Sequence, residues 1–408
     1  MIHPKALDKM KKSLKLTLEN CKVENTWPVF NSYYDNLKKF ASEVIKHRKD
    51  WIDFSSVLSI FSNRVWQALS EKFPNNRTAT GGLKELLGNE ITEQLFDSVI
   101  KYIESIPRKY QFCFPCPSIE GFGEGIVDLS KDFLIKNNHD TAPRGSLLVN
   151  ALRGSNSGFL EARKTYICIE EDGYTEGSAD DPAFINAFSK FKQFIHLGII
   201  NKLFIEALRA PIILGSSFSK GLRTVVFDKA EPDSASCHVS IPEHTAKYLE
   251  KISFSADFIA EMKTKEGVEY NQHKLEPTIN LITAPADNED ANAIKSAVEW
   301  AFEASINSDE TVAFLQICIG IEAILGDIDN EKEPLTTRLA DRCAYILGKN
   351  MVDRKEIRDM FEKLYKVRSK LVHGRRVRLK KDDERYLFWG RRILDRLIRK
   401  EMNFLKID

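Results

Sequence analysis

The sequence predicts an α+β protein with a helical N-terminal region, a mixed α/β middle region and an all-α C-terminal helical bundle. Three observations predict this order along the 408 residues. Apolar residues recur at helical spacing in the first hundred residues, short runs rich in aromatic and β-branched residues follow, and helical spacing returns from about residue 288. We expect boundaries that give regions 1–108, 109–285 and 286–408.

The N-terminal region is predicted to contain four helices. Residues 1–20 alternate lysines with leucines and lack a continuous apolar core, which is typical of an amphipathic helix and not of a signal peptide. Further helices are expected over 30–48, 53–73 and 82–106, where apolar residues keep helical spacing. Pro107 ends this region because proline cannot continue a helix.

The middle region is predicted to mix strands with helices and to end in a linker. Its expected strands are 110–114, 164–169, 212–214, 224–227 and 238–241, and its expected helices are 182–209 and 243–262. Residues 263–287 contain Gly267, Pro277 and Pro285, so they are expected to form a linker or irregular crossing. The role of this region is not indicated by its sequence.

The C-terminal region is predicted to be entirely helical. Residues 311–325 are almost wholly apolar, and a helix that is apolar on all sides is expected to be buried. A helix beginning near Pro334 should end near Leu347, and two more helices are expected over 353–372 and 382–404.

Composition narrows the class of protein. The hydrophobic and charged fractions, 43% and 29%, are ordinary for a soluble globular chain. No apolar run reaches the length of a membrane span, so we expect no membrane association. Seven scattered cysteines favour a reducing cytoplasm over a disulfide framework, and we expect a cytoplasmic location.

Charge is concentrated at the C-terminal end. The net charge is only +1, yet residues 350–408 hold 19 lysines and arginines against 10 acids. A basic segment on a nearly neutral chain is typical of a surface that binds a polyanion. A solvated helix face is the alternative interpretation.

Arg368 falls inside the apolar stripe of the helix predicted over 353–372. At 100 degrees per residue it lies about 40 degrees from Leu364, so its guanidinium needs a carboxylate, a carbonyl, a phosphate or an interface. One alternative is a structural ion pair with Glu322, the only acid within 311–325. Arg338 and Arg342 compete for that carboxylate.

His373 follows Arg368 after four intervening residues. An unbroken helix would point it about 180 degrees from Leu364, away from Arg368. Gly374 permits a left-handed cap that redirects the imidazole, and a dimer could bring the histidine of one subunit to the arginine of the other. A surface or capping histidine is the plain alternative.

This pair of side chains predicts metal-independent RNA cleavage without a cofactor. A neutral imidazole with a pKa near ~6.5 can take a proton from a ribose 2′-OH or give one to the leaving 5′-oxygen. A guanidinium can hold the phosphate and stabilise its developing charge. Five further cations are expected to follow the RNA backbone without reading its sequence, namely Lys366, Lys370, Arg375, Arg376 and Arg378.

Three ordered blocks in the last third of the chain resemble a known family. Residues 321–325 (Ile-Glu-Ala-Ile-Leu), 339–344 (Leu-Ala-Asp-Arg-Cys-Ala) and 364–374 (Leu-Tyr-Lys-Val-Arg-Ser-Lys-Leu-Val-His-Gly) are similar to the Apea-like branch of the HEPN superfamily. The resemblance covers about residues 290–408 and implies a HEPN-like helical domain that dimerises.

The resemblance implies catalytic roles for Arg368 and His373, with Glu322, Ser369 and Tyr365 supporting the site. The residue after the arginine is often Asn, Asp or His in active members, and here it is Ser369. The family includes toxins and antiviral defence effectors, so the resemblance implies an endoribonuclease that a phage-derived or cellular trigger activates. The N-terminal regions would then sense or regulate.

Two other classes of function stay open. One is a catalytically inactive HEPN module that binds RNA, nucleotide or a partner protein. The other places chemistry in residues 109–285, where Cys113 and Cys116 have the spacing of half a zinc site or a redox pair and Cys237-His238 could add ligands. No second Cys-x-x-Cys exists, so no metal is expected, and Gly121–Gly125 is expected to form a turn.

Overall fold

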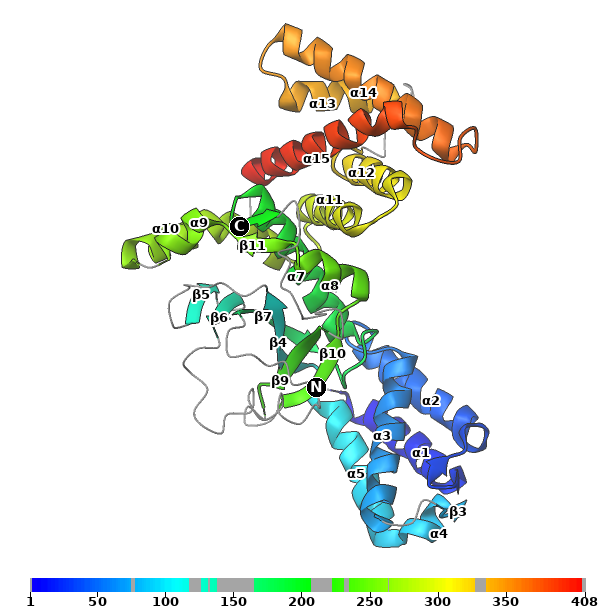
Figure 1. Ribbon diagram of the computed structural model, residues 1–408. Coiled ribbons are helices and arrows are strands. Elements are labelled where there is room, and N and C mark those ends of the chain that lie inside the picture. The colour runs from blue at the N-terminus through cyan, green and yellow to red at the C-terminus, as the bar shows by residue number, and fades with distance from the viewer. Residues whose placement is uncertain are drawn as a thin grey trace. The chain divides into compact units, whose positions relative to one another are not determined.

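The structure is a computed structural model in which helices dominate and strands gather in the middle of the chain (Figure 1). It describes residues 2–74, 78–116, 126–130, 133–137, 165–206, 222–230, 235–262, 264–326 and 335–405. The chain is mixed α+β with a helical C-terminal region, as its sequence predicts.

The chain divides into two compact units. Unit 1 comprises residues 1–112, 170–187 and 225–239, and unit 2 comprises residues 113–169, 188–224 and 240–408. Each unit therefore takes segments that are far apart in the sequence. The three regions expected from the sequence stay a prediction.

Unit 1 begins with helices that enclose one apolar core. The helices are α1 (Pro4–Asn20), α2 (Phe30–Arg48), α3 (Phe54–Lys72), α4 (Leu83–Leu87) and α5 (Asn89–Ser105). Three short antiparallel strands accompany them, β1 (Lys22–Glu24), β2 (Trp27–Pro28) and β3 (Gly81–Gly82). Phe40, Phe61, Leu69 and Val99 are fully buried where these helices meet, which follows from the predicted apolar spacing.

The predicted helix over 82–106 is wrong in one respect, because the structure has two helices there. Gly88 lies between α4 and α5 with φ of +83°. A side chain at that φ would be strained, so only glycine reaches this conformation easily. A glycine within a helical pattern was therefore the signal for the break.

Among the described residues, the largest sheet has six strands in the order β10-β9-β4-β7-β6-β5. Their bounds are β4 (Arg108–Cys116), β5 (Ile126–Ser130), β6 (Phe133–Asn137), β7 (Thr165–Gly173), β9 (Arg223–Asp228) and β10 (Ala235–Ser240). β6 and β7 are antiparallel, with Ile135 opposite Ile167 and Phe133 opposite Ile169. Strands were expected at four of these places, whereas the expected strand 212–214 lies outside the described residues.

Two predicted helices of the middle region are wrong in part, one at its end and the other in its middle. Helix α7 (Pro182–Ile200) ends early because Lys202 adopts φ of +62°, and strand β8 (Phe204–Glu206) follows. The expected helix 243–262 is instead α8 (Glu243–Leu249), strand β11 (Ile252–Phe254) and α9 (Ala256–Glu261). β11 and β8 pair antiparallel, with Phe254 opposite Phe204. Short apolar runs suit both helix and strand, and only this long-range pairing decided between them.

The expected linker over 263–287 is also wrong, because most of it is helix α10 (Lys265–Thr283). The Thr264 hydroxyl caps its start by accepting a hydrogen bond from the Gly267 N–H at 3.0 Å. Leu275, Ile279 and Ile282 bury its apolar face. Burial of that face offsets the cost of Pro277 inside the helix.

The C-terminal helices match the predicted ones closely. They are α11 (Glu289–Ile306), α12 (Glu310–Leu325), α13 (Leu335–Leu347), α14 (Met351–Val372) and α15 (Glu384–Phe404). Helix α12 packs against α11 and α15, while α13 packs against α14. The α12 surface is not wholly buried as expected, since Val312 and Ile319 remain exposed.

Close packing between α12 and α15 depends on small residues. A Cβ at Gly320 would lie 2.9 Å from a methyl carbon of Leu394, and one at Gly390 would lie 3.1 Å from Ile317. Among the described residues, we find no helix that is both long enough and apolar enough to cross a membrane.

Candidate functional site

Arg368 lies on α14 with its side chain directed at α12, which carries Glu322. Nη2 of the guanidinium lies 3.1 Å from Oε1 and 3.2 Å from Oε2 of the Glu322 carboxylate. The side chains are only 27% and 24% exposed, so this pair is partly desolvated. Arg368 was predicted to need a partner because it falls inside the apolar stripe of its helix. This is confirmed, and the partner is the Glu322 carboxylate.

Glu322 pairs with Arg368, and Arg342, one of the two arginines on α13 that were expected to compete for it, binds elsewhere. Nη1 of Arg342 instead donates to the Leu325 carbonyl at the end of α12, at 3.1 Å. That carbonyl belongs to the last turn of the helix, where backbone oxygens lack helical partners. Arg342 therefore caps the C-terminal end of α12, and the Glu322 carboxylate pairs with Arg368.

Only one nitrogen of the Arg368 guanidinium is engaged by Glu322. Both short contacts involve Nη2, and neither Nη1 nor Nε has a hydrogen bond or ion pair within the described part of the chain. A guanidinium presents a planar fork that can bind a second anion through its remaining N–H groups. Glu322 thus orients Arg368 without using up its donors.

Tyr365 lies one turn before Arg368 on α14 and is buried. Its ring stacks on Phe361, with 4.6 Å between ring centroids. Burial raises the pKa of Tyr365, and nearby Cys318 and Glu322 raise it further, so the hydroxyl stays neutral. Burial likewise raises the pKa of the Cys318 thiol. Tyr365 and Cys318 are therefore uncharged, buried neighbours of the ion pair.

His373 lies at the end of α14, where the chain leaves the helix. Its side chain is exposed, and its backbone N–H donates to the Ser369 carbonyl at 3.0 Å. Gly374 adopts φ of +67°, the left-handed conformation that a glycine permits at this position. No hydrogen bond or ion pair of the His373 imidazole occurs among the described residues, and none joins it to Arg368 within one chain.

The predicted RNA-binding cations divide into free and engaged groups. Lys366 and Lys370 on α14, and Arg375 and Arg378 beyond it, are exposed. Arg376 is instead ion-paired with Asp383 and is less exposed. Its guanidinium therefore holds the loop after α14 to the start of α15.

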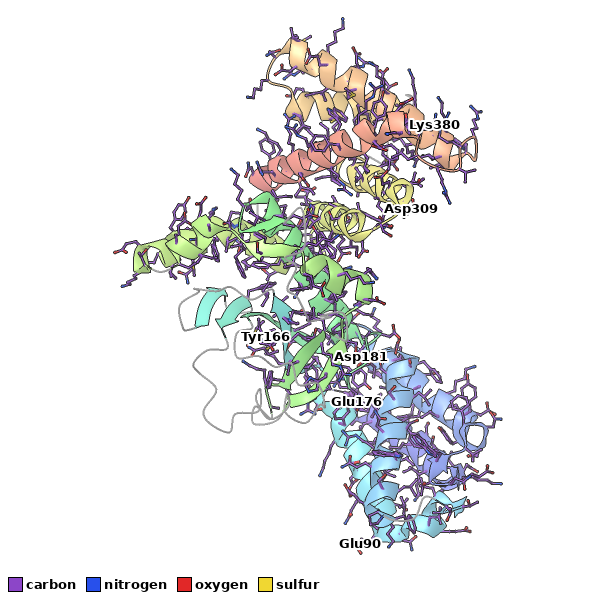
Figure 2. All side chains as sticks on the ribbon, in the orientation of Figure 1. Glu90, Tyr166, Glu176, Asp181, Asp309 and Lys380 are labelled. Carbon is purple, nitrogen blue, oxygen red and sulfur yellow. The ribbon has the colours of Figure 1, made fainter. Side chains whose placement is uncertain are left out.

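The loop after α14 is also held to the start of α12. The Leu379 N–H donates to the Thr311 hydroxyl at 3.0 Å, close to Asp309 and Lys380 (Figure 2). The Val312 and Thr311 N–H groups lower the pKa of Asp309, and nearby Arg378 lowers it further. Sequence reasoning missed Asp383 and Thr311, and neither has a motif that could have indicated these roles.

The cysteines considered for metal or redox chemistry lie in the sheet. Cys113 on β4 and Cys168 on β7 are fully buried, with their sulfur atoms 3.2 Å apart. Where side chains are described, we find no group of three or more His, Cys, Asp or Glu that could hold a metal ion. The Cys116 side chain and Gly121–Gly125 lie outside the described residues.

The chain was compared with protein-family models, curated proteins and solved structures. No protein-family model, curated protein or solved structure matches the chain.

Proposed function

We propose that the C-terminal helices act as a HEPN-type endoribonuclease that cleaves RNA without a metal ion. The observation that carries the proposal is the Arg368 guanidinium, which is oriented by Glu322 through Nη2 alone and keeps two other donor nitrogens for a phosphate. Lys366 and Lys370 on the same helix, and Arg375 on the loop after it, are exposed. Such cations supply affinity for the RNA backbone without sequence preference.

The proposed reaction is attack of a ribose 2′-oxygen on the adjacent phosphorus. His373 removes the 2′-OH proton, the new P–O2′ bond forms, and the P–O5′ bond breaks. Arg368 stabilises the negative charge that develops on the phosphoryl oxygens. The leaving 5′-oxygen takes up a proton from solvent water, and protonated His373 returns its proton to solvent, so the products are a 2′,3′-cyclic phosphate and a 5′-hydroxyl.

A homodimer completes this site. Among the described residues of one chain, no hydrogen bond or ion pair joins the His373 imidazole to Arg368, so a second copy is proposed to bring His373 of the partner subunit to the Arg368 guanidinium. The exposed Val312 and Ile319 on α12 support a protein–protein contact on this helix, because exposed apolar side chains gain from burial. The role as a toxin or antiviral effector belongs to the same proposal, as does the cytoplasmic location.

Cleavage of labelled single-stranded RNA and transfer RNA tests the proposal, with EDTA present throughout. Wild type should produce 2′,3′-cyclic phosphate ends, and His373→Ala should not. His273→Ala is the matched control, since this histidine on α10 is also exposed and should cleave like wild type. Cleavage that persists in His373→Ala would contradict the assigned role.

A second candidate function is a non-catalytic module that binds RNA. The Arg368–Glu322 pair itself favours this function, because a partly buried ion pair can have a purely structural role. It predicts RNA affinity that survives His373→Ala, with no cleavage product from wild type. The same assay, run beside an RNA-binding titration, separates the two candidates.

A further inference from the structure

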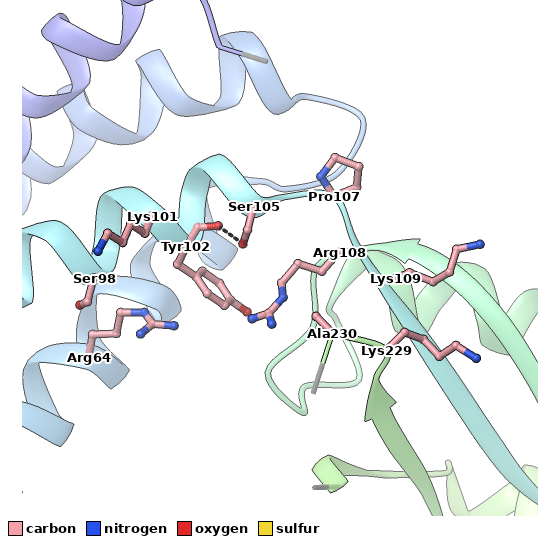
Figure 3. Close-up of a pocket in the computed structure, with 10 residues that line it drawn as sticks. All are labelled: Arg64, Ser98, Lys101, Tyr102, Ser105, Pro107, Arg108, Lys109, Lys229 and Ala230. Atoms are coloured by element: carbon pink, nitrogen blue, oxygen red, sulfur yellow. Dashed lines mark hydrogen bonds between the residues drawn. The ribbon is translucent and has the colours of Figure 1, made fainter. Parts of the chain in front are cut away.

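A pocket in unit 1 gathers cations from segments that are distant in sequence. It has a volume of about 700 Å³ and lies between helix α5, the start of strand β4 and the turn after strand β9 (Figure 3). Its lining residues are Arg64, Ser98, Lys101, Tyr102, Ser105, Pro107, Arg108, Lys109, Lys229 and Ala230. All of them belong to unit 1, so the pocket is a property of that unit alone.

Among the described residues, the lining contains five cationic side chains and no acid. Two carboxylates that do not line the pocket pair with some of these cations and neutralise part of their charge. Nη2 of Arg108 lies 2.7 Å from Oδ2 of Asp228, and Glu170 receives Lys229 at 2.6 Å and Lys109 at 3.8 Å. One carboxylate that is shared by two lysines leaves one positive charge uncompensated. The pocket therefore keeps an excess of positive charge.

Two of the cations have no carboxylate in direct contact. Arg64 and Lys101 form no ion pair within the described part of unit 1, and Nε of Arg64 is buried without a hydrogen bond. A buried donor that lacks a partner is costly, and a bound anion would supply one. Glu176 acts on Arg64 only from a distance, through its charge.

Tyr102 fixes the two arginines against the pocket wall. Cζ of Arg64 lies 4.3 Å from the centre of the Tyr102 ring, and Cζ of Arg108 lies 5.3 Å from it. Figure 3 shows the Tyr102 ring between these two side chains, which come from α3 and β4. Because the ring contacts arginines, it offers little surface for stacking an aromatic ligand. The recognition chemistry of this pocket is charge, not stacking.

We infer that this pocket binds a small ligand that carries two or three linked phosphates. Arginine forks and lysines are the side chains that bind phosphate, and several converging cations favour a multiply charged anion over a single one. The volume suits a ligand of nucleotide size. The inference does not depend on RNA cleavage by unit 2.

Isothermal titration of the full-length protein with inorganic triphosphate tests the inference. The double variant Arg64→Gln/Lys101→Gln should bind about tenfold more weakly, because it removes two charged contacts. Lys38→Gln/Lys39→Gln is the matched control, since it removes the same charge from exposed positions on α2 and should bind like wild type. Lys101→Gln alone changes one exposed side chain and should weaken binding about threefold without affecting folding.

Two further arms identify the source of the phosphates. A nucleoside triphosphate that binds more tightly than inorganic triphosphate would indicate a nucleotide, and equal affinities would indicate recognition of the phosphates alone. Absence of triphosphate binding at millimolar concentration would overturn the inference, and so would equal losses in the pocket and control variants. It would also be overturned if a single-stranded RNA oligonucleotide bound through Arg64 and Lys101 while neither triphosphate did.

Discussion

The two basic regions of this protein are built in opposite ways. The cations that follow Arg368 stand close together in sequence, on the last turn of α14 and the loop after it. The cations of the unit 1 pocket come from α3, α5, β4 and the turn after β9. The first group stays together whenever its helix end forms, whereas the second exists only when four separate segments pack correctly.

Their counter-charges differ in the same way. Glu322 engages one nitrogen of one arginine and leaves the others available. In the pocket, Glu170 divides its carboxylate between two lysines, and Asp228 neutralises Arg108. One carboxylate orients a cation for use, while the others limit the repulsion among cations that folding brings together.

The largest effect on stability should come from replacing a large buried side chain in the core of each unit. Phe61 in unit 1 and Phe314 in unit 2 are both fully buried, so Phe61→Ala and Phe314→Ala should each cost about 3–5 kcal/mol of unfolding free energy. At a urea concentration that unfolds only the variant, Phe61→Ala should lose triphosphate binding completely. RNA binding in Phe314→Ala should fall less steeply, because its cations are neighbours in sequence.

Binding titrations along a urea series would measure this difference. A common midpoint for the loss of both binding activities, in both variants, would contradict the proposed difference between the two regions.

A smaller effect should come from removing the carboxylates. Glu322→Gln should cost about 2 kcal/mol, because it leaves the guanidinium of Arg368 partly buried without its counter-charge. Glu170→Gln should cost less than about 1 kcal/mol, since Lys109 and Lys229 are more exposed and water can solvate them. Glu170→Gln should also tighten triphosphate binding.

Urea unfolding of both variants would provide the two free energies, with Glu243→Gln, which changes an exposed side chain on α8, as the control that should change little. Equal costs at Glu322 and Glu170 would show that exposure of the partner cation does not matter here.

Exchange of arginine for lysine should have a modest effect that depends on the region. Arg64→Lys retains the charge but loses the planar contact with Tyr102, so it should cost about 1 kcal/mol and weaken triphosphate binding. Lys366→Arg on α14 should leave RNA affinity nearly unchanged, because an exposed lysine acts as a point charge on the backbone. Parallel titrations of the two variants would check this, and a large loss for Lys366→Arg would be inconsistent with non-specific contacts.

The smallest effect should appear in the pH dependence of unit 1 through Glu176 (Figure 2). Burial raises the pKa of this carboxyl, although Asn63 and Arg64 lower it in part. The folded state therefore holds the proton to higher pH than the unfolded chain. Stability from this group is fully present below the ordinary carboxyl pKa and falls as pH rises to the raised value.

Glu176→Gln should remove this slope and be more stable than wild type at neutral pH by a few tenths of a kcal/mol up to about 1 kcal/mol. Urea unfolding between about pH 4 and pH 7 would test it. An unchanged slope in the variant would assign the pH dependence to other groups.

Sequence patterns predicted most helices because helical periodicity is local. The bounds of α2, α12 and α14 follow from apolar spacing, and the structure adds side-chain caps at Asp309 and Asn350. The same reasoning failed for α10 and for β8 and β11. In those segments Pro277 and short apolar runs carry ambiguous local signals, and packing against distant residues decided the outcome.

The sequence by itself determined the position of Arg368 on the inner face of α14 and the exposed basic end of that helix, and it permitted the left-handed conformation of Gly374. Tertiary structure alone decided that Glu322 takes Arg368 while Arg342 binds the Leu325 carbonyl. It also decided that Arg64 and Lys101 share a pocket with Lys229. Spacing along a helix sets which residues share a face, but convergence of distant segments depends on the packing of the whole unit.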